Sequence, residues 1–353
     1  MPLHFRIIIA VAIALALSLA VTPAVKWFAH KVGAIDIPKD NRRVHKSPIP
    51  RLGGLAIFIG FIVSVLFMAE IDVQVRGVLI GAIIIVVLGV LDDIYTLRAY
   101  VKFLVQIAAA IVAIYHEVVI EVFSNPFALG EVGSAGLFFL GYAAIPITVI
   151  WIVGITNSVN LIDGLDGLAV GVSTISAVVM LIIALMVSYP NVAIIMAALA
   201  GACIGFLPYN FNPAKIFMGD TGALLLGYLL ATVSIIGLFK FYAAVSLAAP
   251  LLVLAVPLFD TSFAFIRRLL RGKNPMAADR GHFHHRLIDM GLSQKQAVAV
   301  LYAVSGLLGL VAVVITTNEH MRAAVFLIAA GFVVLVAAVI IIFLVFRGTL
   351  NKK

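Results

Sequence analysis

Long apolar runs constrain this chain more than any other feature, because a segment of about 20 apolar residues can span a bilayer as an α-helix. Apolar residues make up 64% of the 353 residues and charged residues 11%, which excludes an ordinary soluble globule and a disordered chain. The run after Arg6 is longer than the apolar core of a signal peptide and is interpreted as the first span. Runs of spanning length occur at about 5–26, 52–69, 75–91, 99–116, 137–156, 168–187, 191–208, 222–239, 244–264, 296–316 and 324–346.

These runs predict an all-α, polytopic membrane protein with about eleven transmembrane helices, in which residues 1–353 form a single integral-membrane domain. One set of loops and helix ends carries 20 of the 24 Lys and Arg residues, so that side is predicted to be cytoplasmic, with the N-terminus outside and the C-terminus inside. The net charge of +8 is therefore an orientation signal, and nucleic-acid binding is not expected. The single cysteine, Cys203, excludes an intramolecular disulfide.

Acidic residues are also divided unequally. All ten acids on the inferred cytoplasmic side are aspartates, whereas five of the six on the other side are glutamates. A site that holds oxygen ligands close to the backbone and a metal favours the shorter carboxylate. The active site is therefore expected on the cytoplasmic loops.

Two aspartate clusters follow apolar runs. Asp92 and Asp93 end the third run, where two adjacent carboxylates need a cation or a shared proton unless they are simply a solvated helix stop. In the second cluster four polar side chains recur at every third position and would form one stripe of a helical turn, which could also be an amphipathic stripe facing water. These four are Asn157, Asn160, Asp163 and Asp166.

A third cluster contains Asn210 and, at the start of the eighth run, Asp220. Asp220 is placed either to cap the following helix or to bind a metal beside it. The cytoplasmic loop near the C-terminal end carries Arg280, His282, His284 and His285. Its histidine spacing does not match structural zinc sites, and the surrounding arginines favour phosphate, although a basic loop can also lie on anionic lipid.

The first cytoplasmic segment contains His45 and continues as Pro-Arg-Leu-Gly-Gly at 50–54, with Arg51. The sole role of these basic residues could be to fix the membrane topology, but the Pro, His and Gly pattern indicates an ordered segment. Carboxylates recruit Mg²⁺, Mg²⁺ and Arg neutralise phosphate oxygens, and histidine can exchange protons near pH 7. Together these groups favour phosphoryl or phosphosugar transfer at a membrane surface.

At these residues the chain resembles the polyprenyl-phosphate N-acetylhexosamine-1-phosphate transferases of glycosyltransferase family 4, and among them the bacterial undecaprenyl-phosphate GlcNAc-1-phosphate transferases. The resemblance covers nearly the whole length, with five motifs in order: Pro-Arg-Leu-Gly-Gly, Asp-Asp, Asn-x-x-Asn-x-x-Asp-Gly-x-Asp-Gly, Met-Gly-Asp and His-x-His-His. It implies a multi-pass enzyme of the bacterial plasma membrane. This enzyme would transfer GlcNAc-1-phosphate from UDP-GlcNAc to undecaprenyl phosphate, with release of UMP, as the first membrane step of a cell-wall or surface glycan.

The resemblance also implies roles for residues, a Mg²⁺ cofactor for which Mn²⁺ could substitute, and a possible homodimer. Asp220 and Asp92 would bind the metal, and Asp92 or Asp93 would deprotonate the lipid phosphate, so that these three are the candidate catalytic residues. The candidate substrate-binding residues are Asn157, Asn160, Asp163, Asp166, Asn210, His282, His284, His285, Arg280, His45, Arg51 and Lys102.

Two alternatives stay open. The muramoyl-pentapeptide branch of the same superfamily carries three successive histidines, whereas Phe283 interrupts the histidines here. A non-enzymatic, ion-coupled transporter would place acids near the middle of spans and show repeat symmetry, neither of which this sequence displays.

Overall fold

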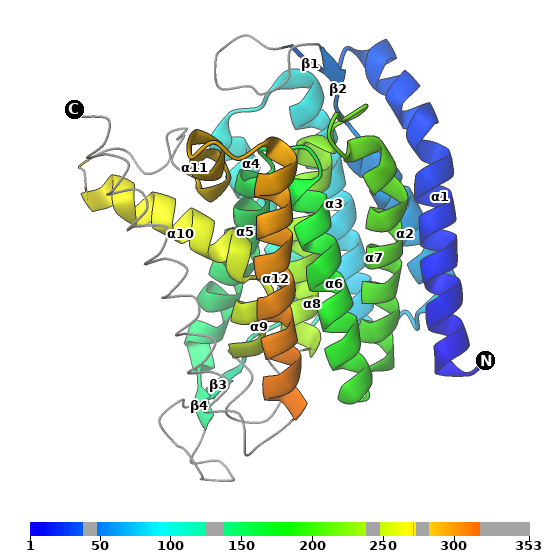
Figure 1. Cartoon of the computed structure of the whole chain (residues 1–353). Helices are drawn as coiled ribbons and strands as arrows, with labels where there is room; N and C mark the ends of the chain where they lie inside the picture. The colour runs from blue at the N-terminus through cyan, green and yellow to red at the C-terminus, as the bar shows by residue number, and fades with distance from the viewer. Residues whose placement is uncertain (38–47, 125–136, 238–247, 271, 273–281, 318–353) are drawn as a thin grey trace.

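The computed structural model describes residues 1–37, 48–124, 137–237, 248–270, 272 and 282–317, and shows a bundle of mostly upright helices (Figure 1). The predicted eleventh span and the candidate residues His45 and Arg280 lie outside these described residues. The helices are α1 (Leu3–Val32), α2 (Gly54–Met68), α3 (Val73–Tyr95), α4 (Ala99–Tyr115), α5 (Ala144–Ile162), α6 (Leu168–Met186), α7 (Pro190–Asn210), α8 (Gly219–Gly237), α9 (Ala248–Val253), α10 (Ala255–Leu270), α11 (Phe283–Asp289) and α12 (Gln294–Thr317), with a 3₁₀ turn at Gly141–Ala143 before α5.

Among the described residues, seven helices are long and apolar enough to cross a membrane, and α2 and α4 are shorter apolar helices. The protein is therefore a helical, polytopic membrane protein, as the sequence predicts, while the count of eleven spans and the orientation stay predictions. Several helices extend beyond the apolar runs. Helix α5 continues to Ile162 and α7 to Asn210, so polar residues expected in loops lie in the last turns of helices.

The run expected at 244–264 is not one helix. Helix α9 ends at Val253, and α10 begins at Ala255 and leaves the bundle at a steep angle (Figure 1). Pro257 explains the break, because it has no N–H to donate to the carbonyl of Val253 four residues earlier. The Ser176 hydroxyl donates to this carbonyl instead, at 2.9 Å.

Helix α8 is the centre of the bundle. All its residues except Asp220 are buried, and it packs most extensively against α3 and α5. The backbones of α3 and α8 approach closely at Gly89, where an added Cβ would lie only 2.3 Å from the Cα of Thr221. This contact fixes the first turn of α8 against the last turns of α3.

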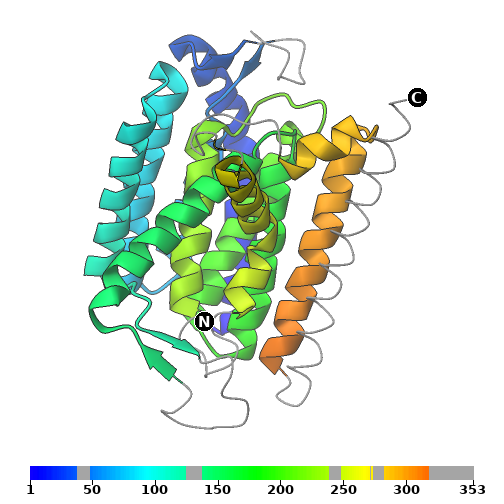
Figure 2. The same cartoon turned by 90° about the vertical axis from the view of Figure 1, so that its left-hand side faces the viewer.

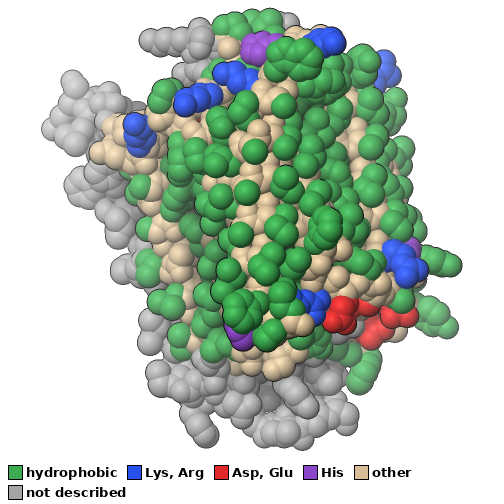
Figure 3. Space-filling view, turned by 90° about the vertical axis from the view of Figure 1, so that its right-hand side faces the viewer, with side chains coloured by type: hydrophobic (Ala, Val, Ile, Leu, Met, Phe, Trp, Pro, Cys, Tyr) green, Lys and Arg blue, Asp and Glu red, His purple; other side chains and the backbone are tan. Residues whose placement is uncertain are grey.

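Two antiparallel hairpins lie at opposite ends of the bundle (Figures 1 and 2). The strands β1 (Ile35–Asp36) and β2 (Ile49–Pro50) pair at the end that also carries α11, and β3 (Val122–Ser124) and β4 (Leu137–Phe139) pair at the other end. On the face shown in Figure 3, most Lys and Arg side chains lie toward the β1–β2 end, whereas the Asp and Glu side chains lie toward the opposite end, beside other Lys and Arg side chains.

Candidate active site

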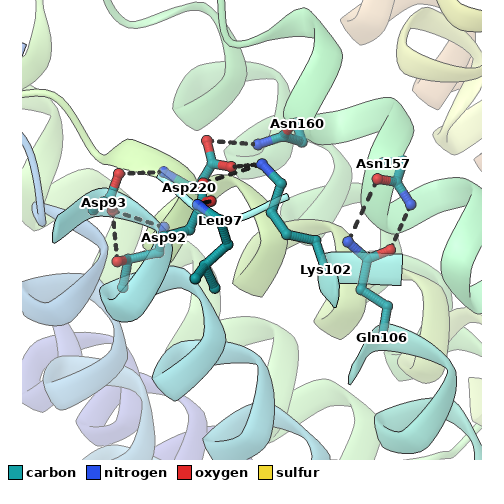
Figure 4. Close-up of polar contacts among 9 residues, drawn as sticks. Asp92, Asp93, Leu97, Lys102, Gln106, Asn157, Asn160 and Asp220 are labelled. Atoms are coloured by element: carbon teal, nitrogen blue, oxygen red, sulfur yellow. Dashed lines mark hydrogen bonds and ion pairs between the residues drawn. The ribbon is translucent and has the colours of Figure 1, made fainter. Parts of the chain in front are cut away.

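The candidate site forms where α3 and α5 end and α4 and α8 begin, and Lys102 lies at its centre (Figure 4). The Lys102 ammonium donates to Oδ2 of Asp220 at 2.7 Å and to Oδ2 of Asp92 at 3.0 Å. The other oxygen of Asp220 accepts from the Asn160 amide at 3.2 Å, and the other oxygen of Asp92 accepts from the Leu97 N–H at 2.7 Å. Three predicted motifs and Lys102 therefore converge on one carboxylate, Asp220.

Asp93 points away from this cluster and into the start of α8. One of its oxygens accepts from the Asp220 N–H at 3.0 Å, and the other accepts from the Thr221 N–H at 3.0 Å and the Thr221 hydroxyl at 2.7 Å. These N–H groups belong to the first turn of α8, which has no intrahelical acceptors for them. Asp93 thus caps α8 from another helix and sets the position of Asp220.

Asn157 does not share a stripe with Asn160, but turns toward α4. Its Nδ2 donates to Oε1 of the buried Gln106 at 2.5 Å, and Nε2 of Gln106 donates back to Oδ1 of Asn157 at 3.4 Å (Figure 4). Gln106 lies one turn after Lys102 on α4, and Asn157 lies one turn before Asn160 on α5. This amide pair therefore holds the two helices together beside the cluster around Asp220.

A polar cavity of about 290 Å³ opens beside Asp220. Burial and the neighbouring carboxylates, of which Asp220 acts most strongly, raise the pKa of Asp163 in this cavity to about 8. A cation bound among these carboxylates would lower that pKa again. The lining residues are Asp36, Arg51, Asp93, Asp163, Gly164, Leu165, Asp166, Asn210, Phe217, Gly219, Asp220, His285 and Gln294.

Two of the predicted residues on the cavity wall organise its loops. Asn210 accepts from the Gly167 N–H at 3.1 Å and donates to the Ile216 carbonyl at 3.1 Å, so both ends of its buried amide are bonded to backbone. Asp166 uses one carboxylate oxygen to accept from the Asn212 amide and the Ala214 N–H, each at 3.0 Å. The other oxygen of Asp166 carries no bond to loop 211–214 and can face the cavity.

The three histidines come from α11 and the residue before it. His285 lines the cavity, and the ring of His284 packs on Gly164, where an added Cβ would collide with it. Burial, with a smaller effect of His285, lowers the pKa of His284 to about 3, so this imidazole is neutral near pH 7. Arg51, which directly follows β2, also lines this cavity, and its guanidinium lies 3.6 Å from the Asp36 carboxylate.

The side chains around Asp220 offer oxygen ligands. Within the described residues, no group of three or more His, Cys, Asp or Glu side chains is arranged to hold a metal ion by itself. Mg²⁺, however, usually takes one or two protein carboxylates and completes its shell with water and substrate phosphate. Asp220 and Asp92, with the Asn160 amide, therefore suit Mg²⁺ in combination with a phosphate-bearing substrate.

An apolar groove of about 470 Å³ lies between α5 and the outward-leaning α10. On α5 its lining runs from Ile147 to Ser158, which is within one turn of Asn160. One end of the groove thus lies two residues before Asn160 on α5. Its residues are Ile120, Ile147, Ile150, Trp151, Gly154, Ile155, Ser158, Leu258, Thr261, Ser262, Phe265 and Ile266.

Sequence reasoning missed Gln106 and Asp260, although each is a strongly polar residue inside an apolar run, a position that is costly unless the residue has a role. Both are almost fully buried, Gln106 against Asn157 and Asp260 against His282. Phe217 and Gln294, which line the cavity, carried no comparable signal in the sequence.

Comparison with known proteins places these features in a family context. Residues 75–238 match the model of "Glycosyl transferase family 4". The chain is 43% identical over 311 residues to a "Probable undecaprenyl-phosphate N-acetylglucosaminyl 1-phosphate transferase" of Bacillus subtilis, covering 88% of this chain and 85% of the relative. It is 36% identical to a "Decaprenyl-phosphate N-acetylglucosaminephosphotransferase" of Mycobacterium tuberculosis, covering 80% and 75%. It is also 35% identical to a "Phospho-N-acetylmuramoyl-pentapeptide-transferase" of Limosilactobacillus reuteri, covering 60% of this chain and 68% of the relative.

Proposed function

Because the chain belongs to glycosyltransferase family 4, we propose that it transfers N-acetylglucosamine 1-phosphate from UDP-GlcNAc to undecaprenyl phosphate and releases UMP. The observation that carries this proposal is the placement of two cavities of opposite character near one charged cluster. The polar cavity is lined by Asp220, which Lys102 links to Asp92. The apolar groove reaches Ser158 on α5, two residues before Asn160, whose amide donates to Asp220. A reaction between a nucleotide sugar and a long lipid phosphate needs this arrangement, since its two substrates differ so strongly in polarity.

The polar cavity is proposed to hold the nucleotide sugar. Its volume of about 290 Å³ is of the size that a nucleoside fills, and Phe217 offers a ring on which a base can stack. The free oxygen of Asp166 can accept from hydroxyl or ring N–H groups. Arg51 and His285 lie on the same wall, where their positive charge or N–H groups can bind the diphosphate.

The apolar groove is proposed to hold the prenyl chain of the acceptor. Its wall is mostly aliphatic and aromatic, and it lies between α5 and α10, which leans away from the bundle (Figure 1). A phosphate at the head of a chain in this groove would lie next to the last turns of α5 and hence near Lys102. The Lys102 ammonium, which lies between two carboxylates, can then also contact the lipid phosphate.

The proposed chemistry is a single displacement. An oxygen of the lipid phosphate forms a bond to the sugar-bearing phosphorus, and the bond from this phosphorus to the bridging oxygen breaks, with its electron pair leaving on UMP. A phosphate monoester already carries nearly two negative charges at pH 7, so little deprotonation is required. Asp92 is better placed than Asp93 for whatever proton remains, because Asp92 lies in the cluster with Lys102, whereas Asp93 points into the start of α8.

Mg²⁺ is part of the proposal, with Asp220 and Asp92 as its protein ligands and Asn160 orienting Asp220. When bound, the ion would neutralise the phosphate oxygens as negative charge develops. The chain itself contributes Lys102, which binds the anionic groups, and Asp93, which fixes Asp220 through the backbone of α8.

The test uses purified protein with UDP-[³H]GlcNAc, undecaprenyl phosphate and Mg²⁺. Labelled lipid and one UMP per transfer are expected, and Asp220→Asn should abolish both. Asp289→Asn, at the exposed end of α11, makes the same chemical change as a control and should keep wild-type activity. An Asp220→Asn protein with full activity would overturn the metal assignment.

The sugar donor is tested by turnover with a panel of UDP-sugars. The longer matches to GlcNAc-1-phosphate transferases and the Phe283 interruption favour UDP-GlcNAc over the muramoyl branch. Strong turnover with UDP-MurNAc-pentapeptide would reverse this assignment. Family membership leaves no support for an ion-coupled transporter.

A further inference from the structure

Asp260 is a buried carboxylate on α10, and both of its oxygens are bonded to α11 or to the residue that precedes it. Asp260 is only 3% exposed. One oxygen lies 2.8 Å from Nδ1 of His282, and the other accepts from the Phe283 N–H at 2.6 Å. A buried carboxylate is costly unless it is bonded in this way, so this position indicates a defined role.

Helix α11 depends on these bonds. It has seven residues, Phe283–Asp289, and a helix this short is not stable in isolation. The residue at its N-cap position, His282, makes no side-chain capping bond. Asp260 therefore supplies the missing cap from a different helix, in the same way that Asp93 caps α8.

The bonds also orient the histidines. A carboxylate oxygen can only accept, so Nδ1 of His282 donates to Asp260 and the tautomer of His282 is fixed. The His282 ring stacks on His284, with centroids 5.7 Å apart and planes 8° apart. His284 in turn packs on Gly164, and His285 lines the polar cavity.

We propose that Asp260 is a positioning residue for the transfer reaction: it holds α11 on α10 so that His284 and His285 close the wall of the nucleotide-sugar cavity. The inference rests on the proposed function for its kinetic meaning. The opposite face of α10 lines the apolar groove with Thr261, Ser262 and Phe265, so Asp260 joins the helix beside the lipid groove to the histidines beside the nucleotide sugar.

Kinetics of Asp260→Ala and Asp260→Asn test this role, with Asp289→Asn as the matched control. For Asp260→Ala we expect kcat/KM for UDP-GlcNAc to fall about 10- to 100-fold, as for other losses of active-site positioning, while KM for undecaprenyl phosphate stays within twofold. Asp260→Asn should be intermediate, since its amide oxygen can still accept from the Phe283 N–H but its NH₂ group cannot accept from His282. Asp289→Asn should match wild type.

Hydrogen exchange separates positioning from general misfolding. Backbone amides of 283–290 should exchange at least tenfold faster in Asp260→Ala than in wild type, while those of α8 keep their protection. Unchanged exchange in 283–290, equal loss of protection in α8, or a kcat/KM for Asp260→Ala within twofold of wild type would each overturn the proposal. A wild-type protein that forms no labelled lipid would refute the proposed function instead, and the exchange result would still decide whether Asp260 holds α11.

Discussion

Replacing Asp93 with asparagine distinguishes a residue that builds the site from one that takes part in the chemistry. The two residues have the same shape, but the carboxylate accepts three hydrogen bonds from the first turn of α8, through Asp220 and Thr221. Asparagine has one acceptor oxygen, which can keep the two bonds from Thr221. Its NH₂ group would then face the Asp220 N–H. Both groups are hydrogen-bond donors, so the Asp220 N–H would lose its acceptor.

The size of the effect follows from these contacts. A buried N–H left without an acceptor costs about 1–3 kcal/mol. Loss of a negative charge at a helix N-terminus costs about 0.3–1 kcal/mol more. We therefore expect Asp93→Asn to reduce the free energy of unfolding by about 1–4 kcal/mol, taken as the sum of these two effects. Because the first turn of α8 also carries Asp220, Mg²⁺ affinity should fall with stability.

The assay combines thermal unfolding in detergent, Mn²⁺ binding followed by electron paramagnetic resonance, and the transfer reaction. Asp72→Asn is the matched control, since Asp72 caps α3 by accepting from the Val75 N–H at 2.8 Å and is exposed at the opposite end of the bundle. Asparagine is as good an N-cap as aspartate at such a position, so the control should lose less than about 1 kcal/mol and keep full activity.

The reasoning is refuted if Asp93→Asn keeps the wild-type melting temperature and Mn²⁺ affinity but loses turnover. That result would show that Asp93 acts on the reacting groups directly. It would also return the role of base to Asp93 rather than Asp92.

Three further predictions concern other contacts. Gln106→Leu should destabilise the protein by about 1–3 kcal/mol by leaving the Asn157 amide unpaired, and a double-mutant cycle with Asn157→Leu should give a coupling energy of about 1–2 kcal/mol. Gly205→Ala should cost about 1–3 kcal/mol, because the added Cβ would lie 2.4 Å from the carbonyl oxygen of Leu15 on α1. Lowering the pH from 8 to 5 should cost about 2 kcal/mol through His284, whose pKa of about 3 in the folded protein lies below its usual 6.5, so that the unfolded chain takes up the proton first.

Controls for these predictions come from the same chain. Gly306 has open space around its Cα, so Gly306→Ala in α12 should be neutral or stabilise by up to about 1 kcal/mol. If it lowers the melting temperature as much as Gly205→Ala, the close contact with α1 is not the cause. His284→Gln should remove much of the acid-induced loss of stability, whereas His30→Gln at an exposed position should not. Equal pH dependence in both variants would contradict the role of His284, and additive effects in the double-mutant cycle would contradict the amide pair.

The sequence predicted the class of fold and most of the site, because in so apolar a chain any cluster of polar residues at a helix end carries information. The structure brings Asp220 together with Asn160 directly and with Asp92 through Lys102, while the roles predicted for these residues stay predictions. The sequence could not assign different roles to the two adjacent aspartates. Asp92 and Asp93 are neighbours in the chain, but successive side chains of a helix point in different directions. Asp92 therefore contacts Lys102, whereas Asp93 contacts the start of α8.

The residues that sequence reasoning missed are those whose partners are distant in the chain. Gln106 and Asp260 each lie within an apolar run, and only the packing of α4 on α5 and of α11 on α10 gives them bonding partners. The break between α9 and α10 was also not predicted from the sequence. Pro257 lies at the break, but the apolar content of 244–264 predicts a continuous span in spite of its prolines.

The central claim is that the bond broken joins the sugar-bearing phosphorus of the nucleotide sugar to the bridging oxygen of its diphosphate. The most direct measurement follows that phosphorus. The purified protein is incubated with undecaprenyl phosphate, Mg²⁺ and UDP-GlcNAc that carries ³²P only in its sugar-bearing phosphate. The account predicts that the label moves into the lipid and that unlabelled UMP appears in equal amount. Release of labelled UDP, with unlabelled sugar on the lipid, would show transfer of the sugar alone and would contradict the account.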